Sequence, residues 1–230
     1  MGIFSIFGGK TITPTDRRNK TIEKLKKEGI AINEKLPLLP SSEEISFKSE
    51  AEIMNRIITA YAAIQVACDI TKGKDYKQSV DYMNDFMAKC KGDKSNLLDK
   101  EKKIMAGKCS KQDIIDVVWT YEAIFTLMWA VGYKADKYEF DVSEKCSGEA
   151  VTYDMVLISK GSNTKPNLKK EKVLDALDLF RCYQWACLEK QKYPETPIGN
   201  VDYEVVAERL RALEWLISDE KDWFNIKLGA

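Results

Sequence analysis

Residues 111–132, KQDIIDVVWTYEAIFTLMWAVG, are the most apolar stretch of the 230-residue chain and decide its fold. The apolar residues recur at helical spacing and Gly132 stands in a stop position, so we expect a helix over residues 111–131. The run approaches the length of a membrane-spanning helix. However, Asp116 and Glu122 would each cost about 2.5 to 3.5 kcal/mol near a bilayer centre. The stretch therefore predicts a helix buried in the middle of a protein core.

Helical patterns also recur on both sides of this segment. Ser49 with Glu52 three residues later is a capping-box signature, and it predicts a helix that runs to about Ile70. Further helices are expected over residues 16–28, 77–90, 168–190 and 203–218, with one short helix after Leu98. The apolar residues of 150–159 fit both the helical and the strand period. We predict an all-α, single-domain multi-helix bundle of about seven or eight helices over residues 16–230, after a flexible N-terminal tail (1–15), with at most one small β-hairpin within 133–165.

Composition and charge exclude several classes of protein. Lys plus Arg equals Asp plus Glu at 36 each, so the chain has no overall field that would attract nucleic acid or an anionic membrane. The six cysteines form no C-x-x-C pair and the chain has no histidine, which argues against a zinc site. The first ten residues do not match a secretory signal. These features predict a cytoplasmic protein with reduced thiols and with neither a cofactor nor a metal.

Charged or polar side chains interrupt the apolar faces of four predicted helices. Glu122 lies opposite the polar stripe of its helix, Arg181 lies within the apolar arc of the next long helix, and Asp178 borders that arc close enough to hold Arg181. A charge on a buried face is costly unless it meets an opposite charge or several hydrogen bonds, so we expect these residues to contact one another. The expected interior set is three carboxylates, three guanidinium groups and one amide: Arg56, Glu122, Asp178, Arg181, Gln184, Glu208 and Arg209.

Two interpretations of this set are open. The buried charges could fix the register of the helices and give the core a unique packing. They could instead line a pocket, floored by Trp129, Trp185 and Trp215, that binds a polar ligand or an acidic peptide end through spare arginine donors. Acid/base catalysis by the carboxylates has less support, because the chain carries no nucleophile motif, metal signature or phosphate loop.

At these residues the chain resembles a bacterial family with no assigned role, the domain of unknown function 4272. The resemblance rests on Glu52–Arg56, on residues 119–122 leading into 127–132, on 173–181 with Trp185-Ala186, and on 205–209 with Trp215-Leu216. Two departures from the family pattern are Gln184 and Leu210, where the family tends to have histidine. The resemblance implies a predominantly helical cytoplasmic protein and supplies no activity.

The sequence thus favours a non-enzymatic protein-binding or adaptor role, with another protein as the partner and without nucleic acid or membrane. The competing hypothesis is a small-ligand binder or an enzyme that uses Glu122, Asp178, Arg181 and Arg209 in an enclosed pocket. The geometry of the arginines distinguishes the two kinds of role. A guanidinium with free donors beside an open cleft favours binding, whereas arginines saturated by carboxylates and away from any cavity favour a structural role.

Overall fold

The computed structural model describes residues 12–133, 141–161 and 165–228. Within these ranges the chain forms eight α-helices, two short 3-10 turns and no strand, which confirms the all-α prediction. The elements are α1 (Pro14–Glu28), α2 (Glu50–Thr71), α3 (Tyr76–Lys89), η1 (Lys94–Asn96), α4 (Asp99–Met105), α5 (Lys111–Ala130), α6 (Gly148–Ser159), α7 (Lys170–Lys192), α8 (Tyr203–Leu216) and η3 (Trp223–Asn225).

Two predictions fall partly outside the described residues. The first eleven residues of the predicted tail, 1–15, are among those not described, and α1 already begins at Pro14. The region 133–165, in which a hairpin was left open, contains residues 134–140 and 162–164, which are likewise not described. Residues 150–159, whose pattern fitted both periods, are helical and form most of α6.

Local sequence explains where several helices begin. Each start has a Ser or Thr whose side chain accepts the backbone N–H three residues on, while the acid at that position bonds back, so two N–H groups without helical partners are satisfied. These capping boxes are Thr13 with Asp16 at α1, Ser49 with Glu52 at α2, and Ser110 with Asp113 at α5. Helix α1 ends at Gly29, whose φ of 67° lies in the left-handed region that glycine adopts without strain.

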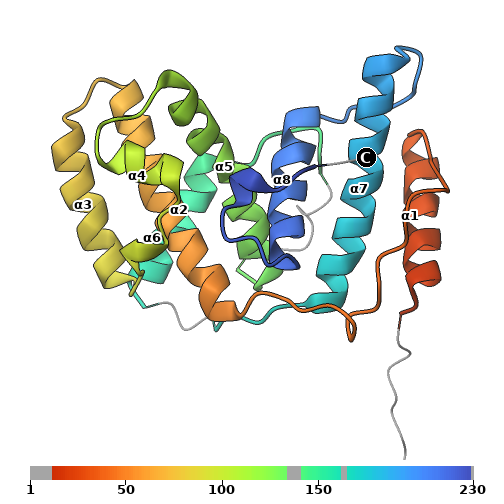
Figure 1. Ribbon diagram of the computed structural model, residues 1–230, viewed down its shortest axis with the longest axis horizontal. Coiled ribbons are helices and arrows are strands. Elements are labelled where there is room, and N and C mark those ends of the chain that lie inside the picture. The colour runs from red at the N-terminus through yellow and green to blue at the C-terminus, as the bar shows by residue number, and fades with distance from the viewer. Residues whose placement is uncertain (1–11, 134–140, 162–164, 229–230) are drawn as a thin grey trace, which may run out of the picture.

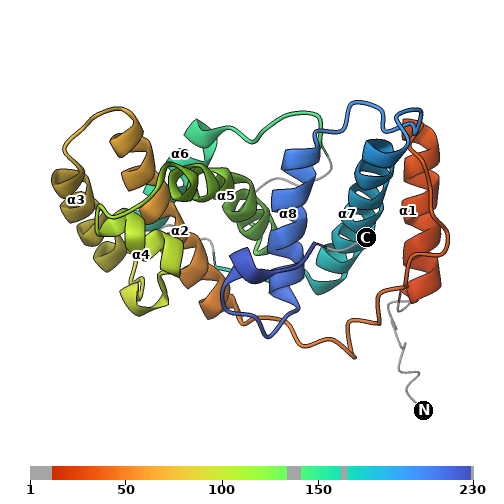
Figure 2. The same cartoon turned by 45° about the horizontal axis from the view of Figure 1, so that its top comes forward.

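The helices lie side by side in a row. From one end to the other the order is α3, α2, α5, α8, α7 and α1, with α4 and α6 packed against the α2–α5 half (Figures 1 and 2). Helix α5 occupies the inner position that its apolar sequence predicted, between α2 and α8. Leu127 of α5, Ile57 of α2 and Leu213 of α8 are fully buried. Helix α1, at the end of the row, packs on α7 alone among the described helices to any substantial extent.

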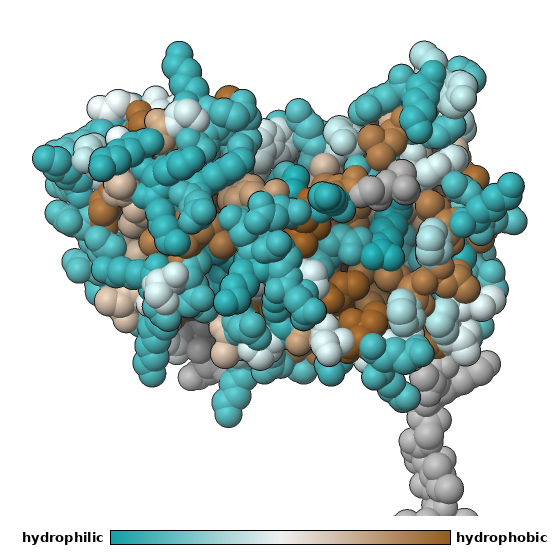
Figure 3. Space-filling view, viewed as in Figure 1, coloured by the Kyte–Doolittle hydropathy of each residue, from teal (hydrophilic) through white to brown (hydrophobic). Residues whose placement is uncertain are grey.

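The chain after α8 turns back over that helix, in dark blue in Figure 1, and its Trp223 is completely buried. Figure 3 shows that the same face of the molecule is hydrophilic over much of its area, with apolar side chains gathered mainly in its right-hand half. None of the described helices combines the length and the apolar character needed to cross a membrane.

Candidate binding cleft

The predicted charged residues do not form one network. Glu122 and Arg209 are buried and face each other across α5 and α8, where Arg209 Nε donates to Glu122 Oε2 at 2.8 Å. The other oxygen of Glu122 accepts the backbone N–H of Cys146 at 2.6 Å, and Arg209 also donates to the carbonyl of Asp141 at 2.5 Å. This pair therefore joins two helices and the segment before α6.

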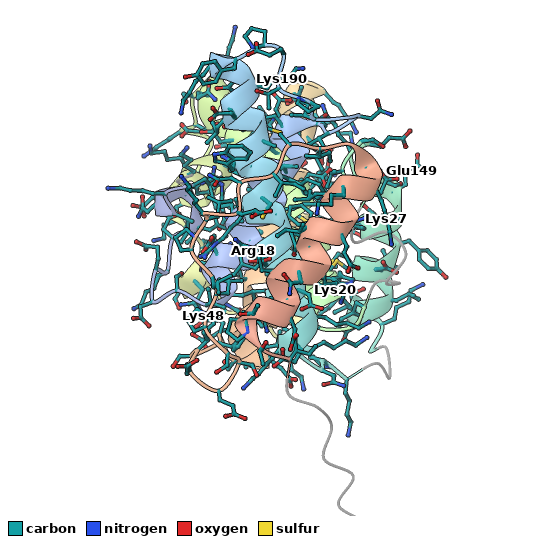
Figure 4. The ribbon with its side chains drawn as sticks, turned by 90° about the vertical axis from the view of Figure 1, so that its right-hand side faces the viewer. Arg18, Lys20, Lys27, Lys48, Glu149 and Lys190 are labelled. Carbon is teal, nitrogen blue, oxygen red and sulfur yellow. The ribbon has the colours of Figure 1, made fainter. Side chains whose placement is uncertain are left out.

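Arg181 and Asp178 do not pair with each other, which corrects the prediction. Arg181 donates to both oxygens of Glu214 at 2.6 and 2.8 Å and keeps 30% of its side chain exposed, because it lies at the edge of the α7–α8 contact. Asp178 is buried and is instead held by Arg18 of α1 at 2.7 Å. Figure 4 looks onto α1 and shows Arg18 where this helix adjoins α7.

The remaining polar residues of the set are also separate. Gln184 is buried, and its Oε1 has no hydrogen-bond partner among the described residues. Glu208 is mostly buried and accepts from Arg211 at 3.3 Å rather than joining the other charges. Burial raises the pKa of Glu208, although Arg211 lowers it in part.

The three tryptophans do not floor a common pocket. Trp129 is buried in the core, and Trp185 is only half-buried. Trp215 is buried and lines a different cleft, which is described below. An enclosed pocket built from Glu122, Asp178, Arg181 and Arg209 is not formed either, because these residues take part in three different ion pairs.

One member of the predicted set, Arg56, lines a large open cleft. The cleft has a volume of about 760 Å³ and lies between the first half of α2, the η1–α4 segment and the chain that follows α8. We call it the Arg56 cleft. Its lining comprises Lys48, Ala51, Glu52, Asn55, Arg56, Ser95, Asn96, Leu97, Leu98, Asp99, Lys102, Trp215, Lys221, Asp222 and Asn225.

Arg56 is held rigidly at the inner wall of this cleft. Its guanidinium is ion-paired with the fully buried Glu101, donates to the carbonyl of Asn96 at 3.0 Å, and lies 4.9 Å from the centre of the Trp223 ring. Three polar atoms of this cluster are buried without a partner among the described residues: Arg56 Nε, Glu101 Oε1 and Trp223 Nε1. Unpartnered buried polar groups are rare and costly, so this cluster is the part of the core most in need of a further hydrogen-bonding group.

Glu101 was not among the residues predicted from the sequence. It lies in α4, whose sequence is DKEKKIM, and the neighbouring lysines are typical of a solvent-exposed helix. Its burial has two causes: Glu101 Oε2 accepts the backbone N–H of Leu98 at 2.8 Å at the start of α4, and Ile104 anchors the same helix in the core. The acid three residues after Leu98 is the signal that was available, since it matches the acidic position of a capping box.

Two lysines at the cleft, Lys48 and Lys221, make no ion pair with a carboxylate of the described residues, although the charge of Lys48 contributes to lowering the pKa of Glu52. Lys48 Nζ lies 5.3 Å from the centre of the Trp215 ring, and this cation–π contact keeps the ammonium group over the cleft. The backbone N–H of Lys48 donates to the carbonyl of Leu216, which fixes its position. Lys221 makes no ion pair within the described ranges.

Two of the three carboxylates that line the cleft, Glu52 and Asp222, accept hydrogen bonds from backbone N–H groups. Glu52 accepts from the backbone and hydroxyl of Ser49 at 2.9 and 2.7 Å, and these two hydrogen bonds lower its pKa. Asp222 caps η3 by accepting the N–H of Phe224 at 2.9 Å, and Asp99 faces Lys102. The groups left without partners are therefore mainly cationic or hydrogen-bond donors.

Metal binding finds no support in the described residues. No group of three or more Cys, Asp or Glu side chains lies close enough together there to hold an ion. All six cysteines are free thiols, and Cys182 and Cys187 are buried.

The comparison with protein-family models shows which family the chain belongs to. The model of the domain of unknown function DUF4272 matches residues 17–226. The chain belongs to this family. The DUF4272 match runs from α1 to the residue after η3, so the Arg56 cleft and the buried pairs Arg18–Asp178, Arg56–Glu101 and Arg209–Glu122 all lie inside the matched residues. No curated protein and no solved structure matches the chain.

Proposed function

We propose that this DUF4272 protein is a non-enzymatic binding module whose Arg56 cleft accepts an acidic segment of a partner protein. The proposal is carried by one observation: a cleft of about 760 Å³ is lined by Lys48 and Lys221, two lysines that make no ion pair within the described residues. A cleft of this size is within the range of about 300 to 1,000 Å³ that is usual for ligand pockets. It is large enough for a few residues of an extended chain.

The chemistry of the walls suits a polypeptide. The side chains of Asn225 and Ser95 offer donors and acceptors of the kind that peptide groups require. Leu97 and Ala51 provide apolar surface between them. Acidic side chains of the bound segment would meet the lysines on the rim, and charge complementarity of this kind accelerates association and selects among partners.

Binding is favoured over catalysis because two carboxylates of the cleft, Glu52 and Asp222, are held by hydrogen bonds from the protein itself. The hydrogen bonds from Ser49 lower the pKa of Glu52, which makes it a weak base, and Asp222 is committed to the cap of η3. Neither carboxylate is available for proton transfer. Arg56 is fixed by Glu101 and Asn96, so it is suited to hold an acceptor in place rather than to change its own protonation.

The test uses defined peptides. A library of acetylated, amidated hexapeptides with Asp or Glu at alternating positions is titrated against the protein by fluorescence anisotropy, beside a matched library with Lys at the same positions. We expect several acidic peptides to bind and the lysine peptides not to, with affinity that falls as salt rises. Changing Lys48→Glu or Lys221→Glu should weaken binding about tenfold or more when the repelled peptide carries two charges near the rim.

Lys20→Glu is the matched control, because Lys20 is an exposed lysine of α1 that lies outside the cleft. Its affinity for the acidic peptides should stay close to that of the unchanged protein. Equal binding of the acidic and lysine libraries would overturn the proposal. So would acidic peptides that bind Lys48→Glu and Lys221→Glu as tightly as they bind the control.

A further inference from the structure

Helix α6 carries apolar side chains on two opposite faces, and only the inner face is packed against the rest of the molecule. Val151 and Met155 on the inner face are fully buried. Tyr153, Val156 and Leu157 lie on the outer face, with 64%, 38% and 40% of their surfaces exposed. Single exposed apolar residues are normal, whereas neighbouring ones on one helix face mark a surface that meets another protein.

Two charged residues, Glu149 and Lys160, stand at the two ends of this outer face. Successive residues of a helix are turned by about 100°, so positions 149, 153, 156, 157 and 160 lie within about 100° of its circumference. Glu149 is exposed in the first turn, and Lys160 is the exposed residue that ends the helix. Neither forms an ion pair within the described residues. Figure 4 shows Glu149 at the margin of the molecule, on the side of α6 away from the bundle.

This outer face is complementary to itself when two copies of α6 lie antiparallel. A two-fold axis exchanges the two copies, so a residue that contacts a second one is contacted by it in return. The midpoint between Glu149 and Lys160 along the helix coincides with the midpoint between Tyr153 and Val156. One axis through that point therefore sets each Glu149 against the Lys160 of the other copy, and each Tyr153 ring against a Val156. The ion pairs and the apolar contacts require the same register.

The charges also select the direction of pairing. Two parallel copies would set Glu149 against Glu149 and Lys160 against Lys160, and like charges placed opposite each other are unfavourable. A helix from an unrelated protein would need the reverse order of charges around an apolar centre. A second copy of this chain supplies that order without any further requirement.

We propose that the outer face of α6 pairs antiparallel with the same face of a second copy of this chain. Helix α6 has 12 residues and is ~18 Å long, so the contact is small. Interfaces of less than about 1,200 Å² belong to weak complexes, and we expect a dissociation constant on the order of 100 μM. No residue of α6 lines the Arg56 cleft, so the dimer does not rest on the function proposed for that cleft.

Sedimentation velocity of the full chain tests the pairing, at concentrations from about tenfold below to about fivefold above that constant. The average mass should rise from that of the monomer toward twice that value. Glu149→Lys leaves lysines at both ends of the face, and Lys160→Glu leaves glutamates, so each variant alone should associate about tenfold more weakly or worse. An equimolar mixture of the two variants should associate about as well as the unchanged chain, because every lysine then faces a glutamate.

The mixture also separates pairing from folding, since a variant that is misfolded cannot regain association by being mixed with another. Tyr153→Ser tests the apolar centre without a change of charge, and it should weaken association about tenfold as well. Removing an acid from the first turn weakens a helix through its dipole. Glu204→Lys is the matched control for this effect, because Glu204 is exposed and occupies the same position in the first turn of α8.

The control should dimerise like the unchanged chain. A chain that stays monomeric at every concentration would overturn the proposal. So would a dimer that tolerates the charge reversals or Tyr153→Ser, and so would a mixture that associates no better than its two components do alone. None of these outcomes depends on whether acidic peptides bind the Arg56 cleft.

Discussion

The buried pair of Arg18 and Asp178 allows a quantitative test of what holds α1 to the molecule. Both side chains are almost inaccessible, with 5% and 2% of their surfaces exposed. Arg18 donates three hydrogen bonds of 2.7 to 3.2 Å to the carboxylate, and two more to the carbonyls of Leu36 at 2.8 Å and Pro37 at 3.1 Å. The hydrogen bonds to Asp178 raise the pKa of Arg18 further above its usual value. One side chain therefore joins α1, α7 and the connector between α1 and α2.

The perturbation is Arg18→Met. Methionine keeps most of the length of the side chain, so the main loss is the charge and its hydrogen bonds, and Asp178 remains buried without a counter-ion. Breaking a buried pair in this way costs about 3 to 5 kcal/mol. That is a large share of the 5 to 15 kcal/mol by which domains of this kind are stable, so about half of the stability could be lost. Urea unfolding followed by circular dichroism measures the difference in the free energy of unfolding.

A double-mutant cycle separates the pair from its surroundings. Asp178→Leu alone should also be costly, because it leaves the guanidinium with only the two carbonyls. The double variant should lose much less than the sum of the single losses, since replacing both charges by apolar groups of similar volume is often close to neutral.

Lys20→Met is the matched control on the same helix. Lys20 lies 2.6 Å from Asp175, but 70% of its side chain is exposed, so its loss should cost less than about 1 kcal/mol. The reasoning is refuted if Arg18→Met costs no more than Lys20→Met. It is equally refuted if the two single losses simply add in the double variant.

Three further predictions concern other buried groups. Glu122→Gln should lower the free energy of unfolding by about 3 kcal/mol, because Arg209 is left without its carboxylate, and an unchanged urea midpoint would contradict this. Burial raises the pKa of Cys182 to about 12 and that of Cys187 to about 11, so iodoacetamide at pH 8 should leave both unmodified in the folded protein, as peptide mass spectrometry would show. The raised pKa of Glu208 means that the folded protein holds this proton more tightly than the unfolded chain, whose value is about 4.5. Stability should therefore fall as the pH rises from 4.5 through the raised pKa, and unfolding midpoints of Glu208→Gln should show a smaller fall over that window.

The helices themselves could be predicted because their signals are local. Apolar spacing and a glycine gave α5 as residues 111–131, and the structure has Lys111–Ala130. The Ser49–Glu52 capping box likewise located the start of α2. Such signals depend on neighbours within four residues, so they survive in a single sequence. The segment 150–159 was ambiguous for the same reason, since its apolar residues suit both periods until packing against α5 decides between them.

The partners of the buried charges could not be predicted in the same way. Glu122, Asp178 and Arg209 were correctly expected to be buried, since each interrupts an apolar face. Arg18 was missed because α1 is charged on nearly every side, and its burial depends on the acids that α7 presents to it. Which carboxylate an arginine meets depends on which helices are neighbours, and no local pattern carries that information.

The row of helices explains why the charges form separate pairs and why the Arg56 cleft lies where it does. In a row each helix meets mainly its neighbours, so a buried charge finds its partner across one interface, as Glu122 does between α5 and α8. Arg56 on α2 meets Glu101 on α4 in this way. Helix α2 has 22 residues and is ~33 Å long, whereas α4 has seven and is ~10 Å long. Helix α4 therefore covers only part of that side of α2, and the chain that returns after α8 closes the remainder incompletely. The two lysines and the open volume lie beside the start of this short helix, where Leu98, Asp99 and Lys102 belong to the lining of the cleft.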